Sequence, residues 1–168
     1  MSEENTSKPI DGLGQLNLFV SAIEISESKQ HKVNQDNKVD NKRLKTEIIS
    51  IETGNIYKGE HIDYIANGSG EFTHKNGMKT IGYFKDGKPN GFATKYSRNG
   101  KVMYEGNWKD GMPDDSGKLY RPDGSLVYDG KWKDGKPNGS GKVYRSDGSL
   151  DYEGKWKDGT LLCFTPMV

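Results

Sequence analysis

The sequence predicts a mainly β protein, an elongated and twisted antiparallel meander of β-hairpins that follows a less regular N-terminal segment. Two observations carry this prediction. Glycine supplies 22 of the 168 residues, and 19 of the 22 lie between Gly59 and Gly159. Within that region a unit of 23 or 24 residues recurs, with two turn signals and one aromatic strand pattern in each copy. Because a single hairpin is marginally stable, we expect the copies to stabilise one another as an array.

Four copies are marked by a glycine that stands two residues before an aromatic side chain, and Gly59 precedes them in register with His61 in the aromatic position. The glycines are Gly59, Gly82, Gly106, Gly130 and Gly154, spaced by 23, 24, 24 and 24 residues. A tyrosine stands two residues before four of them, and Thr80 interrupts that column. Residues two apart in a strand share one face, so the tyrosine, glycine and aromatic residue are predicted to pack together. Glycines on the return strand, such as Gly141, leave room for the rings to lie across the backbone.

Two turns close each predicted hairpin. One is an Asp-Gly pair, and the other is an Asn-Gly or Asp-Gly pair that joins consecutive copies. The first set is Asp86-Gly87, Asp110-Gly111, Asp134-Gly135 and Asp158-Gly159, and the second is Asn76-Gly77, Asn99-Gly100, Asp123-Gly124 and Asp147-Gly148. Such pairs are strong hairpin signals because glycine accepts positive φ. We expect Pro89, Pro113 and Pro137 to lie in turn segments, where a missing amide donor is harmless.

This pattern resembles the MORN repeat family, whose units read Tyr-x-Gly-x-Trp followed by a Gly-rich return strand. The resemblance covers Tyr57 to Gly159, as four full units and a terminal half unit. It implies the hairpin meander and a role as a scaffold or interaction surface, and acidic phospholipids have been proposed as ligands for some members. The chain departs from the pattern at His61, Ala93 and Asp115. The first unit is therefore expected to be a degenerate capping unit.

The rest of the chain divides by composition. We expect residues 1–12 to be a flexible N-terminus, 13–26 an apolar segment, and 27–43 a polar loop or linker. The hairpin array is predicted over 44–160, beginning with a strand rich in β-branched residues. Residues 161–168 are predicted to form a C-terminal cap that covers the edge of the last hairpin.

Inside the apolar segment stands the pentapeptide Gln15-Leu16-Asn17-Leu18-Phe19. It resembles the peptide Gln-Leu-(Ser or Asp)-Leu-Phe by which bacterial polymerases and repair proteins bind the β sliding clamp. The resemblance implies that Leu18 and Phe19 anchor in an apolar pocket, that Leu16 adds contact area, and that the amide of Gln15 forms hydrogen bonds at a polar subsite. Its four informative positions recur by chance in about one chain of this length in several hundred.

An alternative interpretation needs no partner. Leu16, Leu18 and Val20 have period-two spacing, so they can form one face of a buried strand in which Gln15 is incidental. The two interpretations are not wholly exclusive.

The composition argues against several other functions. The chain has 25 basic and 24 acidic residues, for a net charge of +1, so broad attraction to nucleic acid or to a membrane is not expected. A row of lysines recurs at Lys85, Lys109, Lys133 and Lys157, but an aspartate follows each one. The chain shows no secretory signal or membrane-spanning run, and it has one cysteine, Cys163. We therefore expect a cytoplasmic protein.

No residues with the spacing of a catalytic or metal site emerge. His31, His61 and His74 are far apart in the sequence and lack partner ligands, and Cys163 has no neighbouring histidine. The Gly-rich segments lack the order of a phosphate-binding loop. We expect neither an enzyme nor a protein that holds a metal or cofactor.

Two functional hypotheses follow. In the first, the protein binds the bacterial sliding clamp and inhibits host DNA replication, and it is then similar to bacteriophage-encoded inhibitors of the DNA polymerase III β subunit. Its partner-binding residues would be Gln15, Leu16, Leu18 and Phe19. A homodimer formed through exposed sheet edges would add avidity. In the second, the chain is a MORN scaffold for another protein or for acidic phospholipid, and the pentapeptide is only a packing element.

Overall fold

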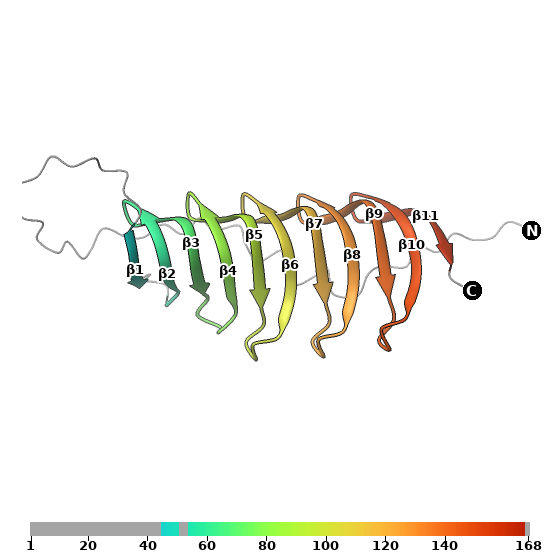
Figure 1. Ribbon diagram of the computed structural model, residues 1–168, viewed down its shortest axis with the longest axis horizontal. Coiled ribbons are helices and arrows are strands. Elements are labelled where there is room, and N and C mark those ends of the chain that lie inside the picture. Colours follow the sequence, from blue (N-terminus) through green and yellow to red (C-terminus); the bar gives the residue numbers. More distant parts are fainter. Residues whose placement is uncertain (1–44, 51–53, 167–168) are drawn as a thin grey trace, which may run out of the picture.

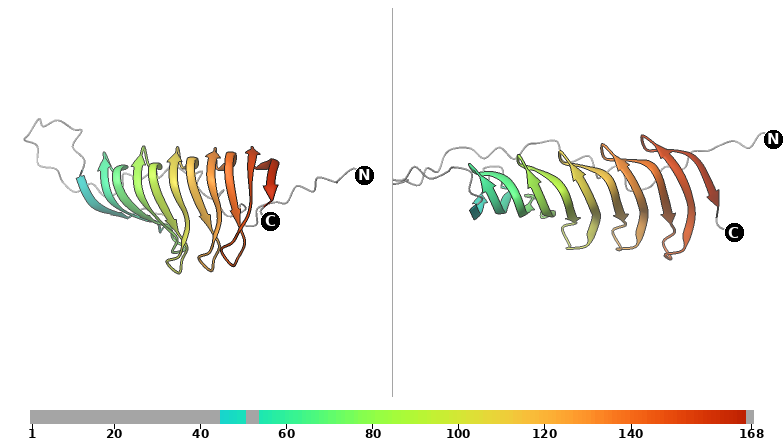
Figure 2. Two further views of the ribbon diagram at one scale, coloured as in Figure 1. Left: turned by 45° about the vertical axis from the view of Figure 1, so that its right-hand side comes forward. Right: turned by 45° about the horizontal axis from the view of Figure 1, so that its top comes forward.

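The protein is a single antiparallel sheet in which every strand pairs with the next one in sequence. The computed structural model describes residues 45–50 and 54–166. Its eleven strands lie side by side in chain order along the long axis of the molecule, and they curve in the same direction (Figures 1 and 2). Their bounds are β1 (Lys45–Ser50), β2 (Ile56–Ile62), β3 (Ile65–Thr73), β4 (Lys79–Lys85), β5 (Lys88–Tyr96), β6 (Val102–Lys109), β7 (Met112–Tyr120), β8 (Leu126–Lys133), β9 (Lys136–Tyr144), β10 (Leu150–Lys157) and β11 (Thr160–Pro166). The predicted β-hairpin meander is confirmed.

The repeat units correspond to pairs of strands. Unit 1 is β2–β3, unit 2 is β4–β5, unit 3 is β6–β7 and unit 4 is β8–β9, and β10 is the terminal half unit. The first set of predicted turns lies between the two strands of units 2, 3 and 4 and between β10 and β11, and in unit 4 Asp134 has φ +47° and Gly135 has φ +77°. The other turns, such as Asp123-Gly124, join one unit to the next along the opposite edge of the sheet.

One face of the sheet, called here the core face, carries the buried aromatic rings. Tyr104 lies between two tryptophans, with ring centroids 5.1 Å from Trp108 and 5.3 Å from Trp132, and it meets both edge-on. Tyr128 has the same edge-on contacts with Trp132 and Trp156. Each ring therefore links its own unit to the next one, which is why hairpins that would be marginal alone form a stable array.

Return-strand glycines make this packing possible, as the sequence predicted. A Cβ added at Gly141 would overlap the phenol ring of Tyr128, and one added at Gly117 would overlap the ring of Tyr104. The hydroxyl group of Tyr128 donates a hydrogen bond to the backbone carbonyl of Lys131, on the same strand, at 3.1 Å. Glycine here serves close approach of a ring to the backbone.

The prediction that the prolines lie in turn segments is wrong. Pro89, Pro113 and Pro137 are the second residues of β5, β7 and β9, and all three are fully buried. Each lies opposite the aromatic residue of its unit, as Pro137 does with Trp132, next to an irregularity in the strand register. Their carbonyls accept hydrogen bonds from the turn glycines of the following unit at 2.9 Å (Gly111, Gly135 and Gly159, respectively). The prolines therefore join consecutive units.

The C-terminal residues extend the sheet. β11 pairs with β10, and the ring of Phe164 lies 5.5 Å from that of Tyr152. In units 3 and 4 the tyrosine contacts the tryptophan of the next unit, as Tyr128 contacts Trp156. Phe164 takes the place of that tryptophan beside Tyr152. Leu162, Cys163 and Phe164 are exposed on this strand.

Candidate binding surfaces

The predicted clamp-binding residues Gln15, Leu16, Leu18 and Phe19 lie outside the described residues. The surfaces that the described structure offers to a partner lie on the array itself. They are the core face, the opposite or outer face, and the two edges formed by the turns.

The core face uses its aromatic rings for packing. Trp108 and Trp132 are 3% exposed, and their indole N–H groups donate to the backbone carbonyls of Ala93 and Gly117 at 2.9 Å. Rings held in this way are not available to stack on a ligand. The prediction that the repeating tryptophans are packing residues is confirmed.

Unit 2 differs from its neighbours on the core face. Thr80 stands where units 1, 3 and 4 have a tyrosine, and Ala93 stands where they have a return-strand glycine. The two changes belong together, because the missing ring leaves room for the methyl group of Ala93. Lys95 pairs with Thr80 in the strand register and is 1% exposed, at the position of the buried Leu119 and Val143. Burial lowers the pKa of Lys95 to about 8.

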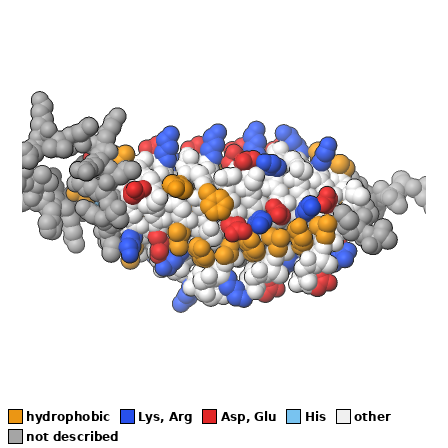
Figure 3. All heavy atoms as spheres, in the orientation of Figure 1, with side chains coloured by type: hydrophobic (Ala, Val, Ile, Leu, Met, Phe, Trp, Pro, Cys, Tyr) orange, Lys and Arg blue, Asp and Glu red, His pale blue; other side chains and the backbone are white. Residues whose placement is uncertain are grey.

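The outer face of units 3 and 4 and of the terminal half unit carries charges of both signs. Lys131 contacts Asp115 at 2.7 Å and Lys142 contacts Glu153 at 2.8 Å, in each case between neighbouring strands. The Glu153 carboxylate also raises the pKa of Lys142. Figure 3 shows this mixture of red and blue side chains along the array, beyond β5. Such a surface is typical of a solvated face.

The outer face of unit 2 is apolar instead. Ile81 and Tyr83 on β4 are 42% and 57% exposed, and Phe92 on β5 is 56% exposed. We call these three residues the unit 2 patch, and Figure 3 shows exposed apolar side chains in this part of the face. A Cβ added at Gly91 would lie 3.3 Å from the Cβ of Tyr83, so Tyr83 leans over β5 beside Phe92. The patch was not predicted from the sequence, although an alignment of the units by their strand positions places these three residues opposite polar ones.

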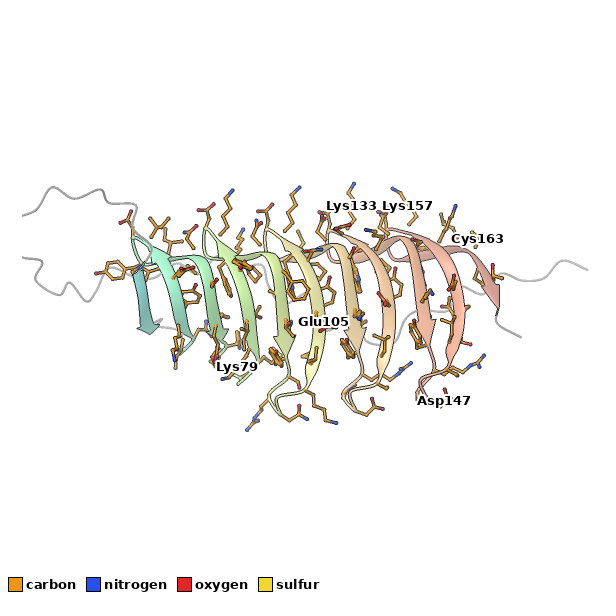
Figure 4. The ribbon with its side chains drawn as sticks, in the orientation of Figure 1. Lys79, Glu105, Lys133, Asp147, Lys157 and Cys163 are labelled. Atoms are coloured by element: carbon orange, nitrogen blue, oxygen red, sulfur yellow. The ribbon has the colours of Figure 1, made fainter. Side chains whose placement is uncertain are left out.

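The predicted lysine row runs along the edge that holds the turns within the units, such as Asp134-Gly135. Lys133 and Lys157 extend from this edge, whereas Lys79 and Asp147 lie at the other edge (Figure 4). The aspartates that follow the lysines remain beside them, and Lys157 is 3.9 Å from Asp158. Asn138 also donates a hydrogen bond to Asp158 at 3.0 Å, which fixes the carboxylate in the turn. The row is therefore accompanied by a matching row of negative charge.

Chemically reactive groups are dispersed over the described part of the array. His61 is 3% exposed and stacks on Tyr64 at 5.5 Å, so it replaces the aromatic residue of unit 1 as the sequence indicated. The Nδ1 atom of His74 accepts a hydrogen bond from the backbone of Asn76 in a turn. Among residues 45–50 and 54–166, no three potential metal ligands lie together. The same residues include no helix long and apolar enough to cross a membrane.

Comparison with known proteins identifies the repeat. The model of the MORN repeat family matches residues 81–102, 104–126, 128–150 and 152–161. These segments begin in β4, β6, β8 and β10, so the matched period is the strand pair seen in the fold. Unit 1 lies outside the match, and it contains the substitution of His61 for an aromatic residue. No curated protein matches the chain.

MORN repeats point to a scaffold that binds protein or lipid. In the described array the rings are packed on the core face, and the outer face is exposed. MORN repeats are thus detected in four segments of the chain between residues 81 and 161.

Proposed function

We propose that this protein binds the bacterial β sliding clamp and inhibits DNA replication. The observation that carries the proposal is the pentapeptide Gln15–Phe19, whose four informative residues agree with the clamp-binding peptide. Leu18 and Phe19 would enter the apolar pocket of the clamp, and Gln15 would form hydrogen bonds at its polar subsite. The protein would then act in the cytoplasm of the bacterial host.

The size of the hairpin array supports steric inhibition. Its eleven strands, spaced by about 4.8 Å, give a rod about 48 Å long. Held at the clamp by the pentapeptide, such a rod would exclude the polymerase and the clamp loader from the same groove, or obstruct the passage of DNA through the ring. The net charge of +1 favours steric obstruction over electrostatic imitation of DNA.

Calorimetric titration of the full-length protein into a purified β sliding clamp tests the proposal. We expect micromolar or tighter binding, and a loss of at least about 30-fold in affinity for Leu18→Ala/Phe19→Ala, because anchor residues carry most of the energy in such interfaces. Asn17→Ala is the matched control, since position 17 is the variable one, and it should bind like the wild type. Circular dichroism verifies that each variant is folded.

Three results would contradict the proposal or change it. No binding to clamps from several bacterial groups would exclude the clamp as partner. Binding that survives the double substitution would place the contact on the array. Unfolding of Leu18→Ala/Phe19→Ala would support the interpretation that the pentapeptide is a packing element.

A second candidate is a scaffold for acidic phospholipid, favoured by the lysine row along one edge. Vesicles that contain phosphatidylserine test it, with vesicles of phosphatidylcholine as the control. Binding that is lost when Lys85, Lys109, Lys133 and Lys157 are all replaced by alanine would establish this function. If clamp binding is the function, we expect no such binding, because the adjacent aspartates cancel most of the field of the row.

A further inference from the structure

The unit 2 patch is a part of the described outer face where three neighbouring large apolar side chains replace polar ones at equivalent strand positions. The position of Ile81 is held by Lys58, Glu105, Asp129 and Glu153 in the other units, that of Tyr83 by Glu60, Asn107, Lys131 and Lys155, and that of Phe92 by Ser69, Ser116 and Ser140. The fold therefore does not require apolar residues here. Three adjacent and exposed apolar side chains, at positions that are polar in the other units, indicate a binding surface.

The chain itself supplies a candidate occupant. The first 44 residues join the array at Lys45, where β1 begins, and β4 is three strands further along the sheet. That separation is about 14 Å at a strand spacing of about 4.8 Å. Residues 27–44 could span up to about 60 Å when fully extended. The apolar segment 13–26 can therefore reach the patch without constraint from its connection.

The composition of these 44 residues indicates which part of them covers the patch. Residues 13–26 contain their main apolar cluster, including Leu16, Leu18 and Phe19, whereas residues 27–43 are largely polar. A segment attached by a short connection is present at an effective concentration in the millimolar range. An apolar contact too weak to hold a separate peptide can therefore hold a segment of the same chain.

We propose that residues 13–26 bind the unit 2 patch of the same molecule, with Leu16, Leu18 and Phe19 covering Ile81, Tyr83 and Phe92. The consequence for clamp binding rests on the function proposed above. Because Leu18 and Phe19 would serve both contacts, the patch and the clamp compete for them. The array then acts as an internal competitor that lowers the affinity of the free protein for the clamp.

Hydrogen exchange of the full-length protein tests the contact directly. The matched variant is Ile81→Glu/Tyr83→Lys/Phe92→Ser, which places on unit 2 the residue types found at these positions in units 3 and 4. We expect the amides of residues 15–20 to exchange about tenfold more slowly in the wild type than in this variant. Equal exchange rates in the two proteins, with the variant folded by circular dichroism, would overturn the proposal.

A spin label locates the contact. Attached at position 21 of the variant Ser21→Cys/Cys163→Ser, it should broaden the methyl signal of Ile81 at least about threefold more than that of Ile56. Ile56 is the control because it is 45% exposed and lies on β2, nearer to the point of attachment. Equal broadening of both signals would show mere tethering and overturn the proposal. If the methyl signal of Ile81 is broadened only by a label on another molecule, in a mixture of labelled and unlabelled protein, the occupant is a second copy. That result also overturns the proposal.

Calorimetry with the clamp separates this proposal from the proposed function. If both hold, the patch variant binds the clamp about tenfold more tightly than the wild type. If neither protein binds the clamp while the exchange difference is present, the internal contact stands and the clamp function fails. If both bind the clamp equally, the internal competition is overturned and clamp binding stands.

Discussion

Units 2 and 4 have the same backbone pairing, yet their two faces differ. In unit 4, Tyr128 lies over Gly141 on the core face, and the outer face carries charged residues such as Lys142. In unit 2, Thr80 and Ala93 replace the tyrosine and the glycine, and the outer face is apolar. The comparison shows that the turns and strand pairing define the hairpin, while the residues on each face can change as long as they change together.

Of the residues that differ between units 2 and 4, the tyrosine should have the largest effect on the free energy of unfolding. Tyr128→Thr imitates unit 2 but leaves Gly141 in place, so it opens a cavity beside Trp132 and Trp156. We expect the free energy of unfolding to fall by about 3–4 kcal/mol, as for other buried aromatic residues. Urea denaturation followed by tryptophan fluorescence measures the change. A loss below about 1 kcal/mol would show that the ring contacts between units are not the main source of cohesion.

The buried lysine of unit 2 should make stability depend on pH. Lys95 has a pKa of about 8 in the folded protein and about 10.5 when unfolded, so between these values the unfolded chain binds more protons. Stability contributed by this group therefore rises from pH 8 to pH 10.5, by up to about 3 kcal/mol, and is constant below pH 8. Lys95→Leu, the residue type at position 119 of unit 3, should remove the rise.

Urea denaturation at pH 7, 9 and 10 checks this prediction through the difference between wild type and Lys95→Leu. The buried tyrosines act in the opposite direction at higher pH. Burial raises the pKa of Tyr57 to about 12, so an unfolded tyrosine ionises first and stability falls above pH 10. A parallel response of the two proteins would show that Lys95 is solvated in the native state.

The return-strand residue should have a smaller effect that depends on its partner. Gly141→Ala forces a methyl group into the ring of Tyr128 and should cost about 1–3 kcal/mol, as expected for overpacking. In a Tyr128→Thr background the same substitution should cost less than about 0.5 kcal/mol, because threonine leaves the space free, as in unit 2. A double-mutant cycle measures the coupling between the two positions. Additive effects would refute the interpretation that the ring missing at Thr80 makes room for the methyl group of Ala93.

The smallest effect is expected on the outer face. Lys131→Ala removes an ion pair with Asp115 in which both side chains are about half exposed. Exposed pairs contribute little, so thermal unfolding should shift by less than about 3 °C. A larger shift would indicate that outer-face charges help to hold the units in register.

Much of the fold could be predicted from the sequence because its signals are local. The Asp-Gly pairs specify turns, and the spacing of Tyr128, Gly130 and Trp132 specifies a common face. What could not be predicted depends on residues that meet across a hairpin. Thr80 and Ala93 were each visible as departures from the pattern, but only the strand register shows that the ring missing at one makes room for the methyl group at the other.

Contacts across a hairpin also explain the other differences between the predicted and the observed structure. Pro137 looks like a turn residue beside Gly135, and its burial against Trp132 follows from the irregular register of that hairpin. The burial of Lys95 was not predicted either, because a lysine in a polar repeat is ordinarily solvated. The clamp-binding residues lie outside the described part of the chain, so their role stays a prediction.

The hydrogen bonds from Gly111, Gly135 and Gly159 to the proline carbonyls of the preceding units have a mechanical consequence. Tension applied through the two ends of the array opens the strands one after another from an edge, so these bonds and the ring contacts break in sequence. Each opened unit of about 24 residues would lengthen the chain by roughly 70 Å, since two folded strands occupy only about 10 Å along the axis. Stretching of single molecules should therefore give a series of evenly spaced steps, with unit 2 among the weakest because it lacks the tyrosine ring.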